Sequence, residues 1–116
     1  MSRQRSIAVI GVALTMLIGV ASAESPRVIE ITAEEFGFTP ASIELEQGET
    51  VEFRLVNQGA LSHNLLIEGA DTRIRTLQGG TTGSATFTPE KTGSVRFLCD
   101  VPGHEQAGMH GEMHVR

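Results

Sequence analysis

Along most of this sequence, short runs of alternating apolar and polar residues each end at a turn residue. Residues 43–46 are a clear case, because Ile and Leu alternate there with two Glu residues ahead of Gln47 and Gly48. Alternation with a period of two turns one face of an extended strand toward a core and the other toward solvent. Beyond residue 23 the sequence shows no helical repeat of useful length. The pattern therefore predicts an all-β fold.

The runs are short and regularly spaced, which narrows the architecture. Turn residues recur roughly every 8 to 12 positions, as they do in β-sandwiches. We therefore expect about seven strands packed as two antiparallel sheets. The strands are expected within residues 28–38, 43–46, 51–55, 65–67, 85–88, 95–99 and 113–115. Residues 71–82 fit a single helical turn, a strand or a loop, and the sequence leaves that choice open.

The N-terminal segment, residues 1–23, has the layout of a secretory signal. Arg3 and Arg5 precede an apolar run of 14 residues, and residues 21–23 (Ala-Ser-Ala) supply the small side chains of a cleavage site. A membrane span needs about 20 apolar residues, so we expect cleavage, with an uncleaved N-terminal anchor as the alternative. The mature chain would then be one domain, residues 24–116, located in the periplasm or elsewhere outside the cytoplasmic membrane.

The mature region is acidic and contains a single cysteine. Its 7 basic and 14 acidic residues give a formal charge of −7. This balance argues against a nucleic-acid-binding protein, which would need a basic face. One cysteine cannot form an intramolecular disulfide, so the thiol of Cys99 requires another explanation.

The residues with the most distinctive chemistry lie near the C-terminus. Cys99, His104 and Met109 follow one another at intervals of five, with the loop residues Pro102 and Gly103 between the first two. A second imidazole, His63, lies in an earlier loop. Two imidazoles, one thiolate and one weak thioether are the ligands of a mononuclear copper electron-transfer site. Zinc could use the thiolate and the imidazoles, but a thioether is a poor zinc ligand.

Taken singly, each of these residues has a simpler interpretation as a packed side chain. Their spacing, in a strand followed by a loop and without any other cysteine, favours a shared metal. Thiolate and thioether suit Cu(I), and imidazole is acceptable to both oxidation states. The set therefore suits a copper ion that changes its charge.

The pattern resembles the cupredoxin, or blue copper, family over essentially the whole mature chain. The segments that carry the resemblance are Phe38-Thr39-Pro40, Gly48-Glu49-Thr50-Val51, Asn57, His63-Asn64, Phe97-Leu98-Cys99, Pro102-Gly103-His104 and Gly108-Met109-x-Gly111. The Cys-x4-His-x4-Met spacing is most similar to that of rusticyanin, sulfocyanin and auracyanin, whereas plastocyanin and pseudoazurin have two residues between Cys and His. The resemblance implies a Greek-key sandwich that binds one copper ion, as Cu(I) or Cu(II), through His63, Cys99, His104 and Met109.

The resemblance also implies how the site is held and where it meets other proteins. Asn64 is expected to tie the two ligand loops together by hydrogen bonds, which would orient the ligands. His104 is expected to reach the surface through an apolar patch formed with Ala60, Leu61, Pro102 and Ala107.

Two functions fit this site. The first is a secreted, monomeric carrier that passes one electron between a donor and an acceptor protein. The second is a copper-handling protein that stores or delivers the metal, and its only sequence hint is a set of extra candidate ligands, His110, Met113 and His114. Strand alternation instead places Met113 in the core and His114 on the surface. A metal-free adhesion-type sandwich would explain none of the ligand spacing.

We expect no enzymatic activity. Copper oxidases and copper nitrite reductases of the same superfamily carry a His beside the copper-binding Cys, whereas Leu98 and Asp100 flank Cys99 here. No Ser-His-Asp or paired-carboxylate arrangement is apparent either.

Overall fold

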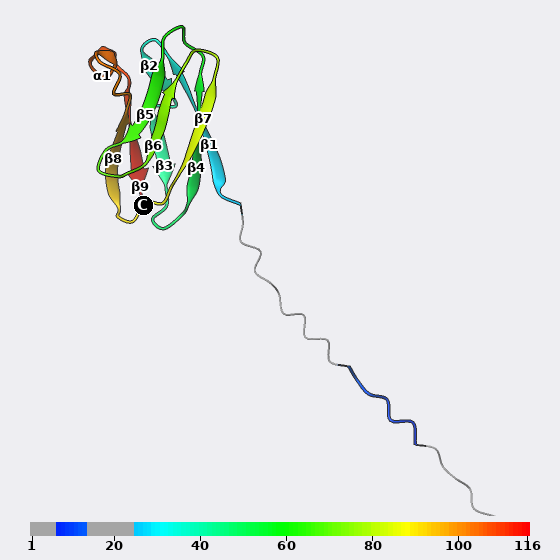
Figure 1. Cartoon of the computed structure of the whole chain (residues 1–116). Coiled ribbons are helices and arrows are strands. Elements are labelled where there is room, and N and C mark those ends of the chain that lie inside the picture. The colour runs from blue at the N-terminus through cyan, green and yellow to red at the C-terminus, as the bar shows by residue number, and fades with distance from the viewer. Residues whose placement is uncertain (1–6, 14–24) are drawn as a thin grey trace, which may run out of the picture.

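The computed structural model describes residues 7–13 and 25–116, and the second of these segments forms a sandwich of two β-sheets (Figure 1). One sheet has the order β2 (Gly37–Thr39), β1 (Arg27–Glu34), β4 (Val51–Asn57), β7 (Thr82–Phe87). The other has the order β3 (Ser42–Leu45), β9 (His110–Val115), β8 (Gly93–Leu98), β5 (His63–Ile67), β6 (Arg73–Leu77). A four-residue helix, α1 (His104–Ala107), lies between β8 and β9.

The two-sheet sandwich expected from the alternation is confirmed, and each sheet is mixed. β1 pairs with β4 in parallel, and β3 pairs with β9 in parallel, whereas the other paired strands are antiparallel. The parallel pairs arise because the chain leaves the first sheet after β2, forms β3 in the second sheet, and returns for β4. Local alternation identifies a strand but carries no information on the direction of its partner.

The core lies between the two layers. Its largest fully buried apolar side chains are Phe53, Phe97, Ile31, Leu45, Leu55, Leu65, Ile67, Ile74, Leu77, Met109 and Met113. Met113 is therefore a core residue, as strand alternation predicts, and His114 on the opposite face of β9 is partly exposed. The open segment 71–82 contains the strand β6.

The predicted signal segment falls largely outside the described residues, which exclude 1–6 and 14–24. The predicted cleavage after residue 23 and the domain boundary at residue 24 therefore stay predictions. Within the segments that the structure describes, no helix combines the length and the apolar character needed to cross a membrane.

Candidate metal centre

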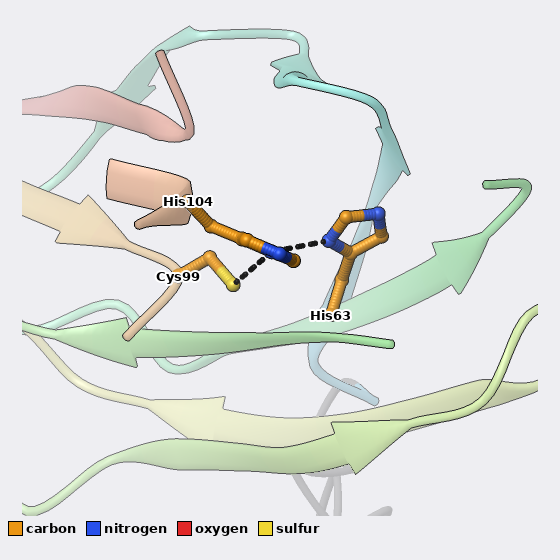
Figure 2. A group of neighbouring side chains, drawn as sticks. All are labelled: His63, Cys99 and His104. Atoms are coloured by element: carbon orange, nitrogen blue, oxygen red, sulfur yellow. Dashed lines mark hydrogen bonds between the residues drawn. The ribbon is translucent and has the colours of Figure 1, made fainter. Parts of the chain in front are cut away.

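Three of the predicted ligands converge at one end of the sandwich. His63 is the first residue of β5, Cys99 follows the last residue of β8, and His104 is the first residue of α1. Their donor atoms all lie within 4.8 Å of one another. The Nδ1 atoms of the two imidazoles are 3.2 Å apart, and the Cys99 sulfur is 3.7 Å from Nδ1 of His104 (Figure 2).

The loop that carries Cys99 and His104 is closed by its own backbone. The amide of Cys99 donates to the carbonyl of Met109 (3.0 Å), and the amide of Met109 donates to the carbonyl of His104 (3.1 Å). The turn into α1 passes through Gly103 at φ +86, a left-handed conformation that favours glycine. Met109 is fully buried, and its backbone bonds to both Cys99 and His104. That the Met109 sulfur is the fourth ligand stays a prediction.

The ligands are shielded from solvent to different degrees. His63 and Cys99 have no exposed surface, whereas His104 is 9% exposed. The ring of His104 meets Phe36 edge-on, with ring centroids 5.3 Å apart, and Phe36 is itself 44% exposed. The site is therefore buried on the side of His63 and approaches the surface on the side of His104.

Asn64 joins the two ligand segments, as the family resemblance implies. Its Nδ2 donates to Oδ1 of Asp100 (2.7 Å), and its Oδ1 accepts from the amide of Asp100 (2.9 Å). Asn64 adjoins His63 and Asp100 adjoins Cys99, so this double contact fixes the two ligands relative to each other. The Arg73 guanidinium donates to both oxygens of Asp100 and lowers the pKa of that carboxyl.

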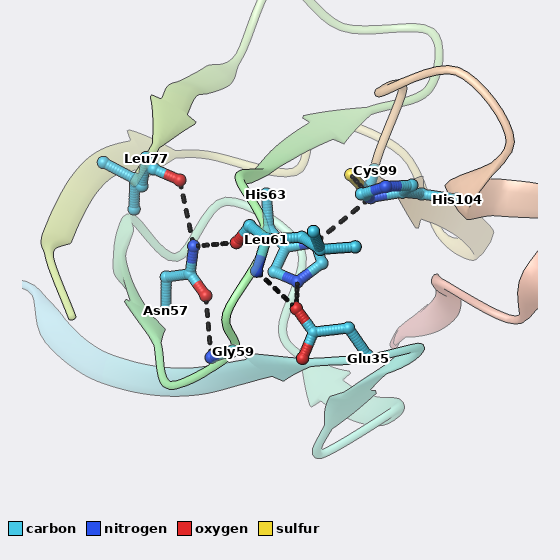
Figure 3. A network of polar contacts seen from close by, with 8 residues as sticks. All are labelled: Glu35, Asn57, Gly59, Leu61, His63, Leu77, Cys99 and His104. Atoms are coloured by element: carbon cyan, nitrogen blue, oxygen red, sulfur yellow. Dashed lines mark hydrogen bonds and ion pairs between the residues drawn. The ribbon is translucent and has the colours of Figure 1, made fainter. Parts of the chain in front are cut away.

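Glu35, which the sequence did not single out, contacts the far side of His63. Its Oε1 accepts hydrogen bonds from Nε2 of His63 (3.1 Å) and from the backbone amide of Leu61 (2.6 Å) (Figure 3). The bond from Leu61 is the main reason that the pKa of Glu35 falls to about 2, although burial opposes it. An ionised carboxylate only accepts, so the bond to Glu35 needs a proton on Nε2 of His63, and Nδ1 is the ring nitrogen that faces the site.

The chain leading to His63 is held by a buried asparagine. Nδ2 of Asn57 donates to the carbonyls of Leu61 and Leu77, both at 2.9 Å, and its Oδ1 accepts from the amide of Gly59 (2.9 Å). Figure 3 shows this network beside the contact between Glu35 and His63. Asn57 therefore orders the loop, and Glu35 orders the ring at its end.

The other candidate ligands do not join this cluster. His110 is exposed, and His114 lies beside Ser94 and Glu112 on the outer face of β9. Among the described residues, His63, Cys99 and His104 form the one group of at least three His, Cys or acidic side chains that could hold a metal. A thiolate and two imidazoles, with a thioether nearby, fit copper by ligand type.

A family model for a cupredoxin-like domain matches residues 6–115, and the chain therefore belongs to that family. A copper-resistant cuproprotein, CopI, from Rubrivivax gelatinosus is 28% identical over 82% of this chain and 70% of its own length. The protein of the same name from Pseudomonas aeruginosa is 24% identical over 82% of this chain and 79% of its own length. In structure, auracyanin B superposes with a TM-score of 0.72 and 24% identity over 80% of this chain and 91% of its own, which shows a shared fold.

The residues expected around His104 at the surface are exposed. Ala60, Leu61, Pro102 and Ala107 all have exposed side chains, and Leu61 is 46% exposed. Phe36 is an addition to the expected set, and it comes from the turn between β1 and β2. One two-residue turn, Glu35 and Phe36, thus contacts both imidazoles of the site.

Proposed function

We propose that this chain is a secreted type 1 copper protein that carries one electron between redox partner proteins and is not itself an enzyme. The observation that carries this proposal is the convergence of His63, Cys99 and His104 in a buried cluster. Met109, buried in the same loop, is the proposed fourth ligand.

Copper, when bound, supplies a one-electron couple between Cu(II) and Cu(I). The protein's part is to keep the ligands in place in both states. Backbone hydrogen bonds within the 99–109 loop and the side-chain contacts of Asn64 hold the segments that carry the donor atoms. The burial of His63 and Cys99 excludes water, which limits rearrangement when the charge changes.

The surface beside His104 is the proposed contact for partners. His104 is the ligand nearest to solvent, and the apolar side chains of Phe36 and Leu61 are exposed. The charge of −7 on residues 24–116 favours partners with basic docking faces and makes their association sensitive to salt. The signal-like segment 1–23 supports a location outside the cytoplasmic membrane.

Titration of the purified metal-free protein with Cu(II) tests the site. We expect one equivalent of copper to bind and to produce an intense visible absorption from thiolate-to-copper charge transfer. Voltammetry is then expected to be reversible, and electron self-exchange to be fast. A colourless complex would contradict the site, and irreversible voltammetry would contradict the carrier function.

A copper-handling role is the second candidate, and the names of the two curated relatives favour it. A protein of this kind releases its metal to a competitor, whereas a carrier retains it through many redox cycles. Mixing the Cu(I)-loaded protein with a chromophoric Cu(I) chelator separates the two functions. Transfer within seconds at a chelator concentration close to that of the protein would favour handling, and retention over hours would favour the carrier.

A further inference from the structure

The turn between β1 and β2 brings a carboxylate to the imidazole that is farther from solvent. Glu35 lies in the turn that joins two strands of the first sheet, and His63 begins a strand of the second, so their contact links the two layers of the sandwich. The side chain of Glu35 is 29% exposed, and its Oε1 accepts hydrogen bonds from both the His63 ring and the Leu61 amide. Within the described residues this is the one carboxylate hydrogen-bonded to a ring of the site.

A glycine makes room for this contact. A Cβ at position 59 would lie 2.6 Å from Oε1 of Glu35 and 2.7 Å from Oε2. The backbone of Gly59 is not in the left-handed region, so glycine is needed there for space and not for conformation. The loop before His63 is therefore shaped to admit the carboxylate.

We propose that Glu35 is a positioning residue that fixes the orientation of His63 and, through its negative charge, lowers the reduction potential of the copper site. A carboxylate that accepts the outer N–H of a metal-bound imidazole makes that imidazole a stronger donor. The stronger donor favours Cu(II) over Cu(I), because the higher charge gains more from it. This inference rests on the proposed function, since it assigns a role at the same copper site.

The variant Glu35→Gln removes the charge and keeps an oxygen that can accept both hydrogen bonds. Loss of an outer contact of this kind weakens metal binding by about 10- to 100-fold, and the retained bonds place this variant near the lower limit. If Cu(II) affinity falls by about tenfold relative to Cu(I) affinity, the reduction potential rises by about 59 mV. Voltammetry of the copper-loaded variant measures this shift.

Glu34→Gln is the matched control for charge. Glu34 is the preceding residue, is also acidic, and is exposed at the end of β1. The same loss of one negative charge there is expected to leave the potential close to that of the unmodified protein. A Glu35→Gln potential no higher than that of the Glu34→Gln control overturns the proposal.

Gly59→Ala provides a second test that leaves Glu35 in the sequence. The added methyl group displaces the carboxylate, so the potential is expected to shift upward as in Glu35→Gln. Gly37→Ala is its control, because a Cβ at Gly37 meets nothing within 4 Å and its backbone is also outside the left-handed region. Equal potentials for the two alanine variants overturn the proposal even if Glu35→Gln fails to fold.

The metal-free protein supplies a readout that does not depend on copper. Nitrogen-15 NMR of the His63 ring is expected to show the proton on Nε2 in the unmodified protein, and a mixture of the two neutral tautomers in Glu35→Ala. A proton on Nδ1 in the unmodified protein overturns the proposed contact. An unmodified protein without the thiolate-to-copper absorption overturns the proposed function, whereas a normal absorption with an unchanged Glu35→Gln potential overturns the role of Glu35 alone.

Discussion

The two histidines of the site are supported in different ways. His63 begins a strand, has no exposed surface, and is held at Nε2 by a carboxylate from the turn between β1 and β2 of the opposite sheet. His104 begins a four-residue helix, is 9% exposed, and borders the exposed ring of Phe36. The loop before His63 is ordered by side-chain hydrogen bonds, whereas the loop that carries His104 is closed by backbone hydrogen bonds.

Because of this difference, the site is fixed on one side and accessible on the other. The half around His63 has a ligand whose ring cannot rotate without losing a hydrogen bond to Glu35. The half around His104 has a ligand that borders the surface, where a partner could approach. Cys99 lies beside His104, with its sulfur 3.7 Å from Nδ1 of that ring, and its neighbour Asp100 is hydrogen-bonded to Asn64, the neighbour of His63. Changes on the two sides should therefore alter different properties.

The largest effect is expected at Cys99, the one sulfur among the three side chains that converge at the site. Cys99→Ser replaces the thiolate by a hydroxyl, which is a much weaker ligand for copper. We expect complete loss of the charge-transfer absorption, measured by visible spectroscopy after addition of Cu(II). Metal-free unfolding in urea should change little by comparison, since a hydroxyl is similar to a thiol in size. Retention of the colour would show that the two halves do not share a metal through Cys99.

The second largest effect is expected for the contact of Asn64 with Asp100, which joins the segment of His63 to that of Cys99. Asn64→Ala removes both hydrogen bonds to Asp100 and leaves the amide of that residue unpaired. The substitution also removes the bond from Asn64 to Oγ1 of Thr76, so the buried Asn64 side chain loses three hydrogen bonds in all. We expect the free energy of unfolding to fall by about 1 to 3 kcal/mol. Urea unfolding of the metal-free protein measures it.

Arg73→Gln is the control for that variant, because it removes a different partner of the same carboxyl. Arg73 and Asp100 are 44% and 38% exposed in their side chains, and exposed ion pairs contribute about 0 to 1 kcal/mol. An equal loss of stability in both variants would contradict the distinction between a buried link and a surface pair.

Met109→Leu tests the loop on the side of His104. Leucine fills a similar volume, so packing is kept, but it removes the thioether proposed as the fourth ligand, a weak donor that would stabilise Cu(II). We expect copper to remain bound and the reduction potential to rise, by about 59 mV for each tenfold change in relative affinity. An unchanged potential in voltammetry would show that Met109 is a core residue and not a ligand.

The sequence predicted the strands best where one face is buried and the other exposed. In β3 the burial alternates strictly at Ile43 and Leu45, and that strand was expected. In β6 the buried residues are Ile74 and Leu77, three positions apart, and the pairing of β5 with β6 shifts register after His63. An irregular strand of this kind lacks the period-two signal, so segment 71–82 could not be assigned from its pattern.

The site was predictable to the extent that its residues lie close together in the chain. The spacing of Cys99, His104 and Met109 is a local signal, and the geometry brings the first two of them together with His63. Glu35 lies 28 residues from His63 and reaches it only because the two sheets face each other. In the sequence, Glu35 is marked only as a second acidic residue after Glu34 that interrupts the alternation. That signal does not indicate that Glu35 contacts His63.

The smallest effect is expected at the surface beside His104. Leu61→Ser removes an apolar side chain that is 46% exposed, while the backbone amide that donates to Glu35 is kept. Val28→Ser is the control, because Val28 is also exposed, at 45%. Val28 lies near the start of β1, whereas Glu35 follows the other end of that strand. We expect electron self-exchange of the copper-loaded protein to slow by about tenfold in Leu61→Ser only, within the range that interface variants span. The potential should change little in both, because neither substitution alters a charge or the backbone hydrogen bond from Leu61 to Glu35. Equal self-exchange rates in the two variants would remove the surface beside His104 as the place where electrons enter and leave.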